Sequence, residues 1–374
     1  MFVEYLFEVN PVTLLLIVIS LIFFVKQSTK GPDSKTQKKY EETQITYKNY
    51  ESLSPNEQNK NSILVMSYNV LAYYFTKYEY FPYCPEQYLH VKYRSPRIIN
   101  EIEKVDPDVL CLQECDFDLF SEYYLPNLEA LGYNCHYKAS SSNRIVINVV
   151  CYKKKLFSVQ EEFKIDLNDE LTKRDEAFNK FKDATVINMT HNPSGKRIVI
   201  VNTHLYWNPE FEFVKYGQIA KIIKDIEKKY SASVPVILCG DFNSLPSSNV
   251  LKYVYNNAPE LDSIKKGDVN KNKKLIAEFW EEFTHHLDLR SAYDCYKSSG
   301  LVSEPDYVNN HPDFTAYTEE FSGTLDYIIY SSKHFGVMQV LNVPTHDPEV
   351  KSAKLPNKTY PSDHFKIAAR FKLI

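Results

Sequence analysis

The sequence has no strong excess of charge of either sign. Its 374 residues include 44 Lys and Arg against 48 Asp and Glu, which gives a formal net charge of −4 at pH 7. A chain that binds nucleic acid through an overall basic field carries many more cations than anions. The composition therefore excludes that mode of binding, and an anionic partner would have to be held by a local set of residues.

The cysteines show neither the spacing of a zinc site nor the dense pattern of a secreted disulfide framework. There are seven of them, an odd number. Several lie inside apolar runs, such as Cys111 in VLCLQE, Cys151 in NVVCY and Cys239 in VILCGD. We therefore expect buried free thiols in strands, which is typical of a protein in a reducing compartment.

Internal repeats of short period are also missing. No LxxLxL array precedes residue 62, so the sequence offers no leucine-rich-repeat surface for docking into a large complex.

One long apolar run is present, VTLLLIVISLIFFV at 12–25, and lysines follow it from Lys26 onward. We predict that residues 1–25 are a single transmembrane anchor, because extending the run back to Leu6 reaches about the length that crosses a bilayer. The lysines after it place the downstream chain in the cytosol by the positive-inside rule. A mitochondrial targeting segment is the alternative location signal, and the polar residues 26–61 read as a flexible linker.

From residue 62 to 374, short apolar runs alternate with helical patterns, which predicts one α/β domain. A helix is expected to begin at Ser95–Pro96, with serine as N-cap, and another is expected over 211–230. The expected strands are 63–70, 108–114, 148–153, 184–190, 197–205, 235–243, 325–331 and 365–371.

Polar side chains gather where these expected strands end. Each could be an ordinary turn residue or cap, since Asp and Asn favour such positions. Five strand ends of this kind, however, indicate a functional edge of the sheet. Carboxylates, amides and histidines without a cysteine cluster suit a hard cation such as Mg²⁺, with Mn²⁺ as a substitute. The residues are Asn69, Glu114, His204, Asp241, Asn243, Asp363 and His364.

Six ordered blocks of sequence resemble the endonuclease/exonuclease/phosphatase superfamily. Within it they are most similar to the deadenylase branch, which includes the carbon catabolite repressor catalytic subunit, Angel, nocturnin and the 2′,5′-phosphodiesterase. The resemblance covers 62–374 and implies a DNase-like four-layer α/β sandwich. The blocks are LVMSYNVLA, DPDVLCLQE, NTHLYWNP, CGDFNSLP, FTAYTEEFSGTLDYIIYS and LPNKTYPSDHF.

The resemblance also implies roles for the residues that match its motifs. Glu114 would bind the catalytic Mg²⁺ with Asn69 beside it, and Asp363 would complete the acidic cluster. Asp241 would activate the attacking water. The remaining implied catalytic residues are His204 and His364, which would hold the scissile phosphate, Asp326, which would orient His364, and Asn243, which would contact phosphate or base.

Two further positions match the adenine clamp of the deadenylases. Pro209 follows the NTHL motif and Phe321 precedes the LDY motif, although either could be a plain turn or core residue. An aromatic ring there would stack on a base of single-stranded RNA. The chain departs from the family at Asn143–Asn148, where an acidic residue followed by glycine is usual, so its adenosine preference is open.

The resemblance predicts a Mg²⁺-dependent phosphodiesterase, most simply a 3′-5′ exoribonuclease that removes poly(A) from single-stranded RNA and releases AMP. Alternatives on the same fold are a 2′,5′-oligoadenylate phosphodiesterase and a nocturnin-like dinucleotide phosphatase. A membrane-associated lipid phosphodiesterase such as a sphingomyelinase ranks lower. A catalytically dead binding module ranks last, because all the acidic and histidine positions are kept.

Overall fold

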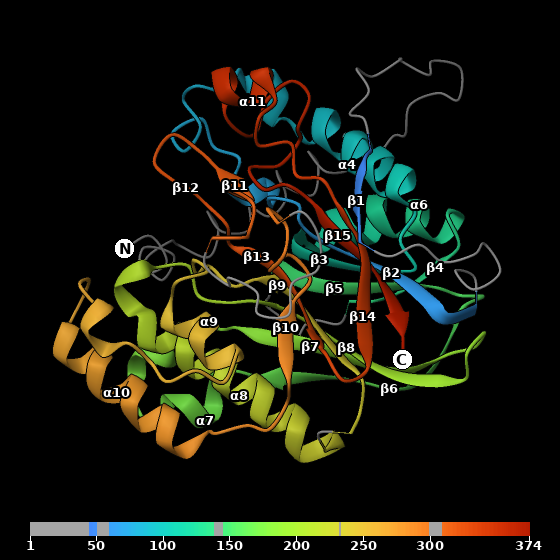
Figure 1. The fold of residues 1–374 in the computed structure, drawn as a ribbon. Helices are drawn as coiled ribbons and strands as arrows, with labels where there is room; N and C mark the ends of the chain where they lie inside the picture. The colour runs from blue at the N-terminus through green and yellow to red at the C-terminus, as the bar shows by residue number, and fades with distance from the viewer. Residues whose placement is uncertain (1–44, 51–59, 138–144, 232, 299–308) are drawn as a thin grey trace, which may run out of the picture.

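The computed structural model describes residues 45–50, 60–137, 145–231, 233–298 and 309–374. Two β-sheets lie face to face in the middle of the molecule, and helices cover the outer face of each (Figure 1). A small two-stranded sheet of β11 (Ala316–Tyr317) and β12 (Ser322–Gly323) stands apart from them. This arrangement fits the predicted α/β sandwich.

The first large sheet has seven strands in the order β1-β14-β15-β2-β3-β5-β4. Its central strand β2, with the sequence SILVMSYN, is buried along its whole length, as the apolar run from Ile63 to Met66 predicts. The strands are β1 (Tyr47–Asn49), β14 (Phe335–Leu341), β15 (Ile367–Leu373), β2 (Ser62–Asn69), β3 (Val109–Asp116), β5 (Val146–Lys153) and β4 (Tyr133–His136).

The second large sheet has six strands in the order β10-β13-β9-β8-β7-β6. All eight strands expected from the sequence exist in the two sheets, and each begins and ends within two residues of its expected bounds. The strands of this sheet are β10 (Leu289–Ser291), β13 (Asp326–Ser331), β9 (Val236–Asp241), β8 (Lys196–His204), β7 (Asp183–His191) and β6 (Phe157–Asp166).

Helices form the outer layers. On the first sheet lie α4 (Val91–Val105), α5 (Phe117–Leu119), a π-helical turn (Phe120–Tyr124) and α6 (Leu125–Ala130). The short α3 (Glu86–Leu89) packs through Leu89 in a small separate apolar cluster with Leu71, Phe81 and Cys84. On the second lie α8 (Glu212–Tyr230), α9 (Asn249–Val254) and α10 (Val269–Glu282), shown below the sheets in Figure 1. The remaining helices of the described residues are α7 (Asp169–Thr172), α11 (Pro348–Ala353) and 3-10 turns at Tyr73–Phe75, Glu176–Phe178, Pro209–Phe211 and Leu261–Ser263.

Three apolar clusters hold these layers together. The central one joins the facing sides of the two sheets, with Val65 and Val109 of the first opposite Ile200 and Ile237 of the second. The other two lie between each sheet and its helices. The expected amphipathic helix at 211–230 is α8, which buries its apolar stripe on the second sheet.

Helix α4 begins earlier than the sequence indicates. The N–H groups of Tyr93 and Arg94 already donate to the carbonyl of His90, so the helix starts at Val91 and Pro96 lies inside it. Pro96 is the sixth residue of the helix, so it removes one N–H bond of the second turn, and the remaining turns continue to Val105. The expected N-cap at Ser95 is therefore wrong.

Residues expected in the linker also contribute to the fold. Tyr47–Asn49 form β1, an edge strand that pairs antiparallel with β14. A three-residue strand is too short to give a periodic signal, so its partner rather than its own sequence defines it.

The cysteine prediction holds for five residues and fails for two. Cys135 and Cys151 lie directly opposite each other on β4 and β5, with their Cα atoms 4.1 Å apart, and form a disulfide. The sequence alone does not show that the pairing of β4 with β5 places these two cysteines opposite each other. The five buried free thiols are Cys84, Cys111, Cys115, Cys239 and Cys295.

The predicted transmembrane anchor is withdrawn. Residues 1–25 lie outside the described part of the chain, and within that part no helix has both the length and the apolarity to cross a membrane. The uninterrupted run at 12–25 is also shorter than the roughly 20 residues that a bilayer needs, and its extension has to include Glu8. The membrane location and the cytosolic orientation that depended on the anchor are withdrawn with it.

Two buried histidines make the folded state sensitive to acid. Burial lowers the pKa of His311 to about 3 and that of His191 to about 4. Both are 2% exposed or less, and among the described residues neither ring nitrogen of His311 has a hydrogen-bond partner. Each must stay neutral in the fold but takes a proton in the unfolded chain below pH about 6.5.

We therefore expect stability to fall as the pH drops from 7 to 5. The pKa of each histidine is lower in the folded protein than in the unfolded chain. Its contribution to the free energy of unfolding is therefore complete above pH about 6.5 and decreases below that pH. For His311 the loss is about 2 kcal/mol at pH 5. Urea unfolding at the two pH values should show a smaller loss for His311→Leu than for the wild type. Equal losses in the two proteins would contradict this assignment.

Candidate active site

The ends of strands from both sheets meet at one edge. β2 pairs parallel with β3, and β8 pairs parallel with β9, so each pair ends at the same level. Asn69, the last residue of β2, connects the sheets: its Nδ2 donates to Glu114 Oε1 at 3.1 Å and to Asp241 Oδ2 at 3.0 Å. The amide is fully buried, and its Oδ1 accepts the N–H of Leu71 at 3.0 Å. Both the Nδ2 and the Oδ1 of Asn69 are therefore held by hydrogen bonds.

Glu114 is aimed at the site by an irregularity in β3. The strand pairing with β5 shifts register between Leu112 and Cys115, and Glu114 takes a left-handed φ of 57° within this bulge. Its Oε2 accepts the N–H of Ala72 at 3.0 Å. Burial, together with the negative charge of Asp363, raises the pKa of the Glu114 carboxyl.

Asp241 follows a glycine that no residue with a side chain could replace. Gly240 has a φ of 149°, and a Cβ atom there would lie 1.9 Å from the carbonyl oxygen of Thr203. This close approach of β9 to β8 sets Asp241 beside His204. Asp241 Oδ1 accepts the N–H of Asn243 at 2.8 Å. Burial raises the pKa of the Asp241 carboxyl to about 7, against the lowering effect of His364.

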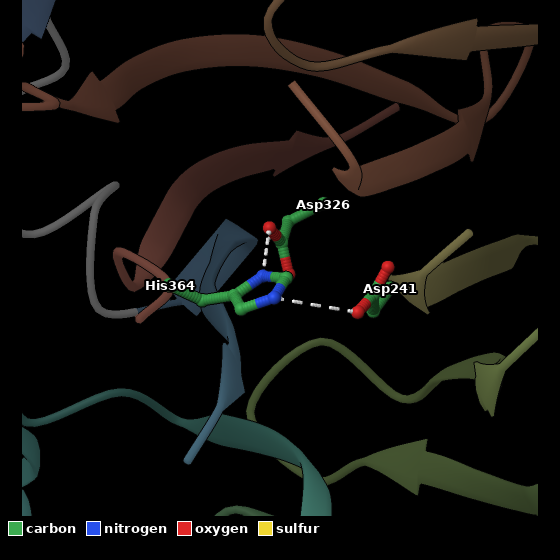
Figure 2. A group of neighbouring side chains, drawn as sticks. All are labelled: Asp241, Asp326 and His364. Carbon is green, nitrogen blue, oxygen red and sulfur yellow. Dashed lines mark hydrogen bonds and ion pairs between the residues drawn. The ribbon is translucent and has the colours of Figure 1, made fainter. Parts of the chain in front are cut away.

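His364 lies between two carboxylates, as Figure 2 shows. Its Nδ1 contacts Asp326 Oδ2 at 2.8 Å, and its Nε2 faces Asp241 Oδ2 at 3.7 Å. The hydroxyl of Thr315 donates to the same Asp326 oxygen at 2.6 Å. Burial alone would lower the pKa of His364, but the charges of Asp326 and Asp241 outweigh it and raise the pKa well above its usual value. The ring is therefore held as a cation.

His204 has the opposite state. Its Nε2 lies 3.6 Å from Asp241 Oδ2 and its Nδ1 lies 4.0 Å from Glu114 Oε1. Burial, and then the positive charge of Lys182, lower its pKa well below the usual value. The site thus holds one neutral and one charged imidazole on either side of Asp241.

Glu114 is the residue that best fits a divalent metal. Asp241, Asp326 and His364 offer ligand atoms that lie within 4.8 Å of one another, but an imidazole held as a cation cannot coordinate a metal. Glu114 lies beside Asn69, and burial, followed by the negative charge of Asp363, raises the pKa of its carboxyl. A hard cation with oxygen ligands would stabilise the charged form of this carboxylate.

Two of the outer predicted residues lie close to this centre. Asp363 is half-buried and acts electrostatically on Glu114, and its carbonyl accepts the N–H of Tyr317. Asn243 donates through Nδ2 to the carbonyl of Leu205 at 3.2 Å. Both therefore border the carboxylates and imidazoles of the site.

The predicted substrate-side residues lie on loops. Phe321 is 39% exposed on the turn between β11 and β12, and Pro209 is exposed at the start of a 3-10 turn after β8. Their joint action as an adenine clamp stays a prediction. The segment 143–148, where the chain departs from the family, lies partly outside the described residues, and its last three residues belong to β5.

Two positioning residues escaped the sequence analysis. Arg94 of α4 is buried and donates to the carbonyls of Val70, Leu71 and Pro361, which ties the loop after β2 to the loop before His364. Lys215 of α8 is 5% exposed, its Nζ donates to the carbonyl of Asn243 at 2.8 Å, and burial lowers its pKa to about 8. Both lie on helices in ordinary amphipathic patterns, which gave no functional signal.

Removing the carboxylate of Asp326 should change the charge of His364. In Asp326→Asn the ion pair and one charge that raises the pKa are lost, so His364 should titrate at a lower pH than in the wild type. Histidine ring ¹⁵N chemical shifts followed from pH 5 to 9 measure this directly. Asp313→Asn, an exposed carboxylate paired with Lys297, is the control and should leave the His364 titration unchanged. An unaltered His364 titration in Asp326→Asn would contradict the assigned pair.

Comparison with known proteins now identifies the class. The model of the Endonuclease/Exonuclease/phosphatase family matches residues 66–364, and the chain belongs to that family. A relative is the CCR4-Not complex 3'-5'-exoribonuclease subunit Ccr4 of Yarrowia lipolytica, 28% identical over 360 residues, 83% of this chain and 48% of that protein. Another is 2',5'-phosphodiesterase 12 of Rattus norvegicus, 29% identical over 337 residues, 83% of this chain and 52% of that protein. The chain thus spans about half the length of these relatives.

Solved structures of other proteins have a similar fold. The crystal structure of ANGEL2, a 2',3'-cyclic phosphatase, superposes with a TM-score of 0.72 at 25% identity, covering 88% of this chain and 98% of that one. The human Nocturnin catalytic domain has the same fold, with a TM-score of 0.61 at 22% identity and coverage of 88% and 98%. These relatives confirm the predicted resemblance to the deadenylase branch.

Proposed function

We propose that this chain is a Mg²⁺-dependent 3′-5′ exoribonuclease that shortens single-stranded poly(A) RNA and releases AMP. The observation that carries the proposal is Asp241, whose carboxyl has a pKa of about 7 and lies within 4 Å of a neutral and a charged imidazole. A carboxylate with this pKa can accept a proton from water near neutral pH, which an ordinary aspartate does poorly. The exoribonuclease named among the relatives supports the choice of RNA. The catalytic unit would comprise residues 62–374.

In this mechanism Asp241 takes a proton from the attacking water as the new P–O bond forms. The bond between phosphorus and the 3′ oxygen of the penultimate nucleotide breaks. AMP leaves with its 5′ phosphate. The released 3′ oxygen takes a proton from solvent to become the free 3′ hydroxyl of the shortened strand, and Asp241 returns its proton to solvent. Hydrolysis thus consumes one water per nucleotide removed and needs no oxidant or second substrate.

His364 and His204 would have different roles at the scissile phosphate. His364 is held cationic by Asp326 and would stabilise the charge that develops on the phosphoryl oxygens. His204 is neutral, so it can donate a single ring N–H to the phosphate without repelling His364. Asn69 keeps Asp241 and Glu114 in a fixed relative position, since one amide binds both carboxylates.

Glu114 and Asn69, with Asp363 nearby, would hold the Mg²⁺. When bound, the metal supplies neutralisation of phosphate charge. Pro209 and Phe321 would enclose the terminal adenine, and Asn243 would contact the phosphate or the base from between them. The exposed ring of Phe321 packs over Gly323, where a Cβ atom would lie 2.8 Å from its Cζ, so the ring position depends on that glycine.

The experiment that tests the proposal incubates the full chain with Mg²⁺ and 5′-labelled RNAs. The RNAs are poly(A) and poly(U) of equal length and a 2′,5′-linked oligoadenylate, with NADPH and adenosine 2′,3′-cyclic phosphate tested alongside. We expect stepwise shortening of poly(A) from its 3′ end with release of AMP, abolished by chelator.

Other outcomes would redirect the proposal. Equal shortening of poly(U) would remove the adenine clamp but keep the exonuclease. Cleavage confined to the 2′,5′ linkage would place the chain with its relative 2',5'-phosphodiesterase 12. Hydrolysis of the cyclic phosphate alone would place it with ANGEL2, the 2',3'-cyclic phosphatase of similar fold. Inactivity on all RNAs would overturn the proposed function.

A further inference from the structure

An exposed phenylalanine stands between two lysines close to the active site. Phe181 is 68% exposed, with Lys180 and Lys182 on either side in the sequence. Its φ is 51°, in the left-handed region that bulky side chains avoid. An exposed apolar side chain alone needs no explanation. A phenylalanine in a costly conformation that directs it away from the core does need one.

A single buried side chain holds the turn in this conformation. Asn168 Oδ1 accepts the N–H groups of both Lys180 and Lys182 at 3.2 Å, and its Nδ2 donates to the Lys182 carbonyl at 3.0 Å. Asn168 is itself 7% exposed, and its backbone N–H and Nδ2 both donate to Asp166 Oδ1. The turn is therefore fixed by the fold before any partner binds.

The turn lies against the loop that leaves the active site after His204. Lys180 Nζ is 4.9 Å from the ring centre of Tyr206 and 5.4 Å from that of Phe211. Lys182 directly precedes β7, whose Ala184 pairs with Thr203, the residue before His204 on β8. The 205–211 loop is anchored in turn, because Tyr206 N–H donates to Gln218 Oε1 at 3.0 Å.

A second exposed aromatic residue belongs to the same loop. Trp207 is 63% exposed, and its ring centre lies 6.1 Å from that of Tyr206, the ring that Lys180 covers. The 180–182 turn and Trp207 thus present two aromatic faces and two cations next to His204 of the active site. This combination suits a single nucleic-acid strand, in which every base offers a face to stack and every linkage a negative charge.

We propose that Lys180, Phe181, Lys182 and Trp207 form a strand-binding rim, which holds the nucleotides of a single-stranded RNA on the 5′ side of the scissile phosphate. Phe181 and Trp207 stack on bases, and the two lysines pair with backbone phosphates. The rim explains how an enzyme of net negative charge retains a long substrate, since the cations are placed locally. This inference rests on the proposed RNA substrate and adds a site beyond the terminal nucleotide.

The test compares a short and a long substrate of the full chain. Wild type and Phe181→Gly are given the dinucleotide ApA and a five-nucleotide oligoadenylate, and kcat/KM is measured for the first cleavage. The variant should lose about tenfold on the pentamer, which corresponds to one lost base stack. The dinucleotide offers the rim one base and no further phosphate, whereas the pentamer offers several of each. The kcat/KM for the dinucleotide should therefore fall less, and the ratio of the pentamer value to the dinucleotide value should fall.

The melting temperature distinguishes a stacking role of Phe181 from a structural one. Glycine adopts a φ of 51° without steric strain, so Phe181→Gly should melt at the wild-type temperature or above it. Phe181→Trp restores an aromatic face and should recover the preference for the pentamer. Lys180→Gln should reduce by about one unit the slope of log affinity against log salt concentration.

Direct binding keeps this inference separate from the catalytic proposal. The fluorescence anisotropy of a labelled ten-nucleotide adenylate strand is measured in chelator, so that no hydrolysis occurs. About tenfold weaker binding by Phe181→Gly supports the rim even if the wild type hydrolyses no RNA, which would overturn the proposed function alone. Unchanged binding and an unchanged pentamer-to-dinucleotide ratio would overturn the rim while leaving the exonuclease intact.

Discussion

Asp241→Asn should lower kcat by at least about a thousandfold with only a small change in melting temperature. The amide cannot take a proton from water, whereas it keeps the size of the carboxyl and the acceptor for the N–H of Asn243. Two effects on stability oppose each other. Burial raises the pKa of Asp241 to about 7, so the charged form costs folding free energy at pH 8, and a neutral amide removes that cost. The new Nδ2, however, faces the Nδ2 of Asn69, which donates to Asp241 Oδ2 in the wild type.

The measurement pairs single-turnover hydrolysis of poly(A) with thermal unfolding at pH 8. Asp225→Asn, a carboxylate on α8 paired with Lys221, is the control and should keep full activity. A variant at 241 that is both inactive and strongly destabilised would leave the catalytic role unsupported. One that remains active would exclude Asp241 as the base.

Glu114→Gln should abolish the dependence of activity on Mg²⁺, with a loss of about a thousandfold or more. Glutamine retains an oxygen to accept the N–H of Ala72. Its new Nε2 faces the Nδ2 of Asn69, which donates to Glu114 Oε1 in the wild type, so we expect a loss of stability that is equal with Mg²⁺ and with chelator. Glutamine also lacks the negative charge that a hard cation requires. The wild type should melt at a higher temperature with Mg²⁺ than with chelator, because a ligand that binds the folded state stabilises it, and the variant should lose this difference.

Glu278→Gln provides the matched control on α10, an exposed carboxylate on the helical layer that covers the second sheet. It should keep both the activity and the Mg²⁺-dependent rise in melting temperature. If Glu114→Gln retained that rise, the metal would be held elsewhere in the chain, and the predicted ligand role of Glu114 would be lost.

The sequence predicts the central strands well for a physical reason. Both faces of β2 and β9 are covered, so most of their residues are apolar, and the polar residue that ends each strand follows an apolar run. Asn69 and Asp241 were visible for this reason. The direct contact between them was not visible, because it depends on how the two sheets pack face to face.

The features that escaped prediction depend on contacts between distant parts of the chain. The conformation of Phe181 is imposed by Asn168, and the disulfide of Cys135 with Cys151 depends on strand register. In the sequence, Arg94 and Lys215 look like ordinary polar residues of amphipathic helices. Each acquires a role only because the carbonyls that it binds come from loops elsewhere in the sequence.

Arg94 also bears on the entropy of substrate binding. One guanidinium holds the carbonyls of Val70, Leu71 and Pro361, so the loops that carry Asn69 and His364 can shift only together with α4. Their ordering is completed when the protein folds rather than when RNA arrives. Little of the contact energy between the enzyme and the phosphate is therefore needed to fix its own loops, and more of that energy remains to favour the transition state over the bound ground state.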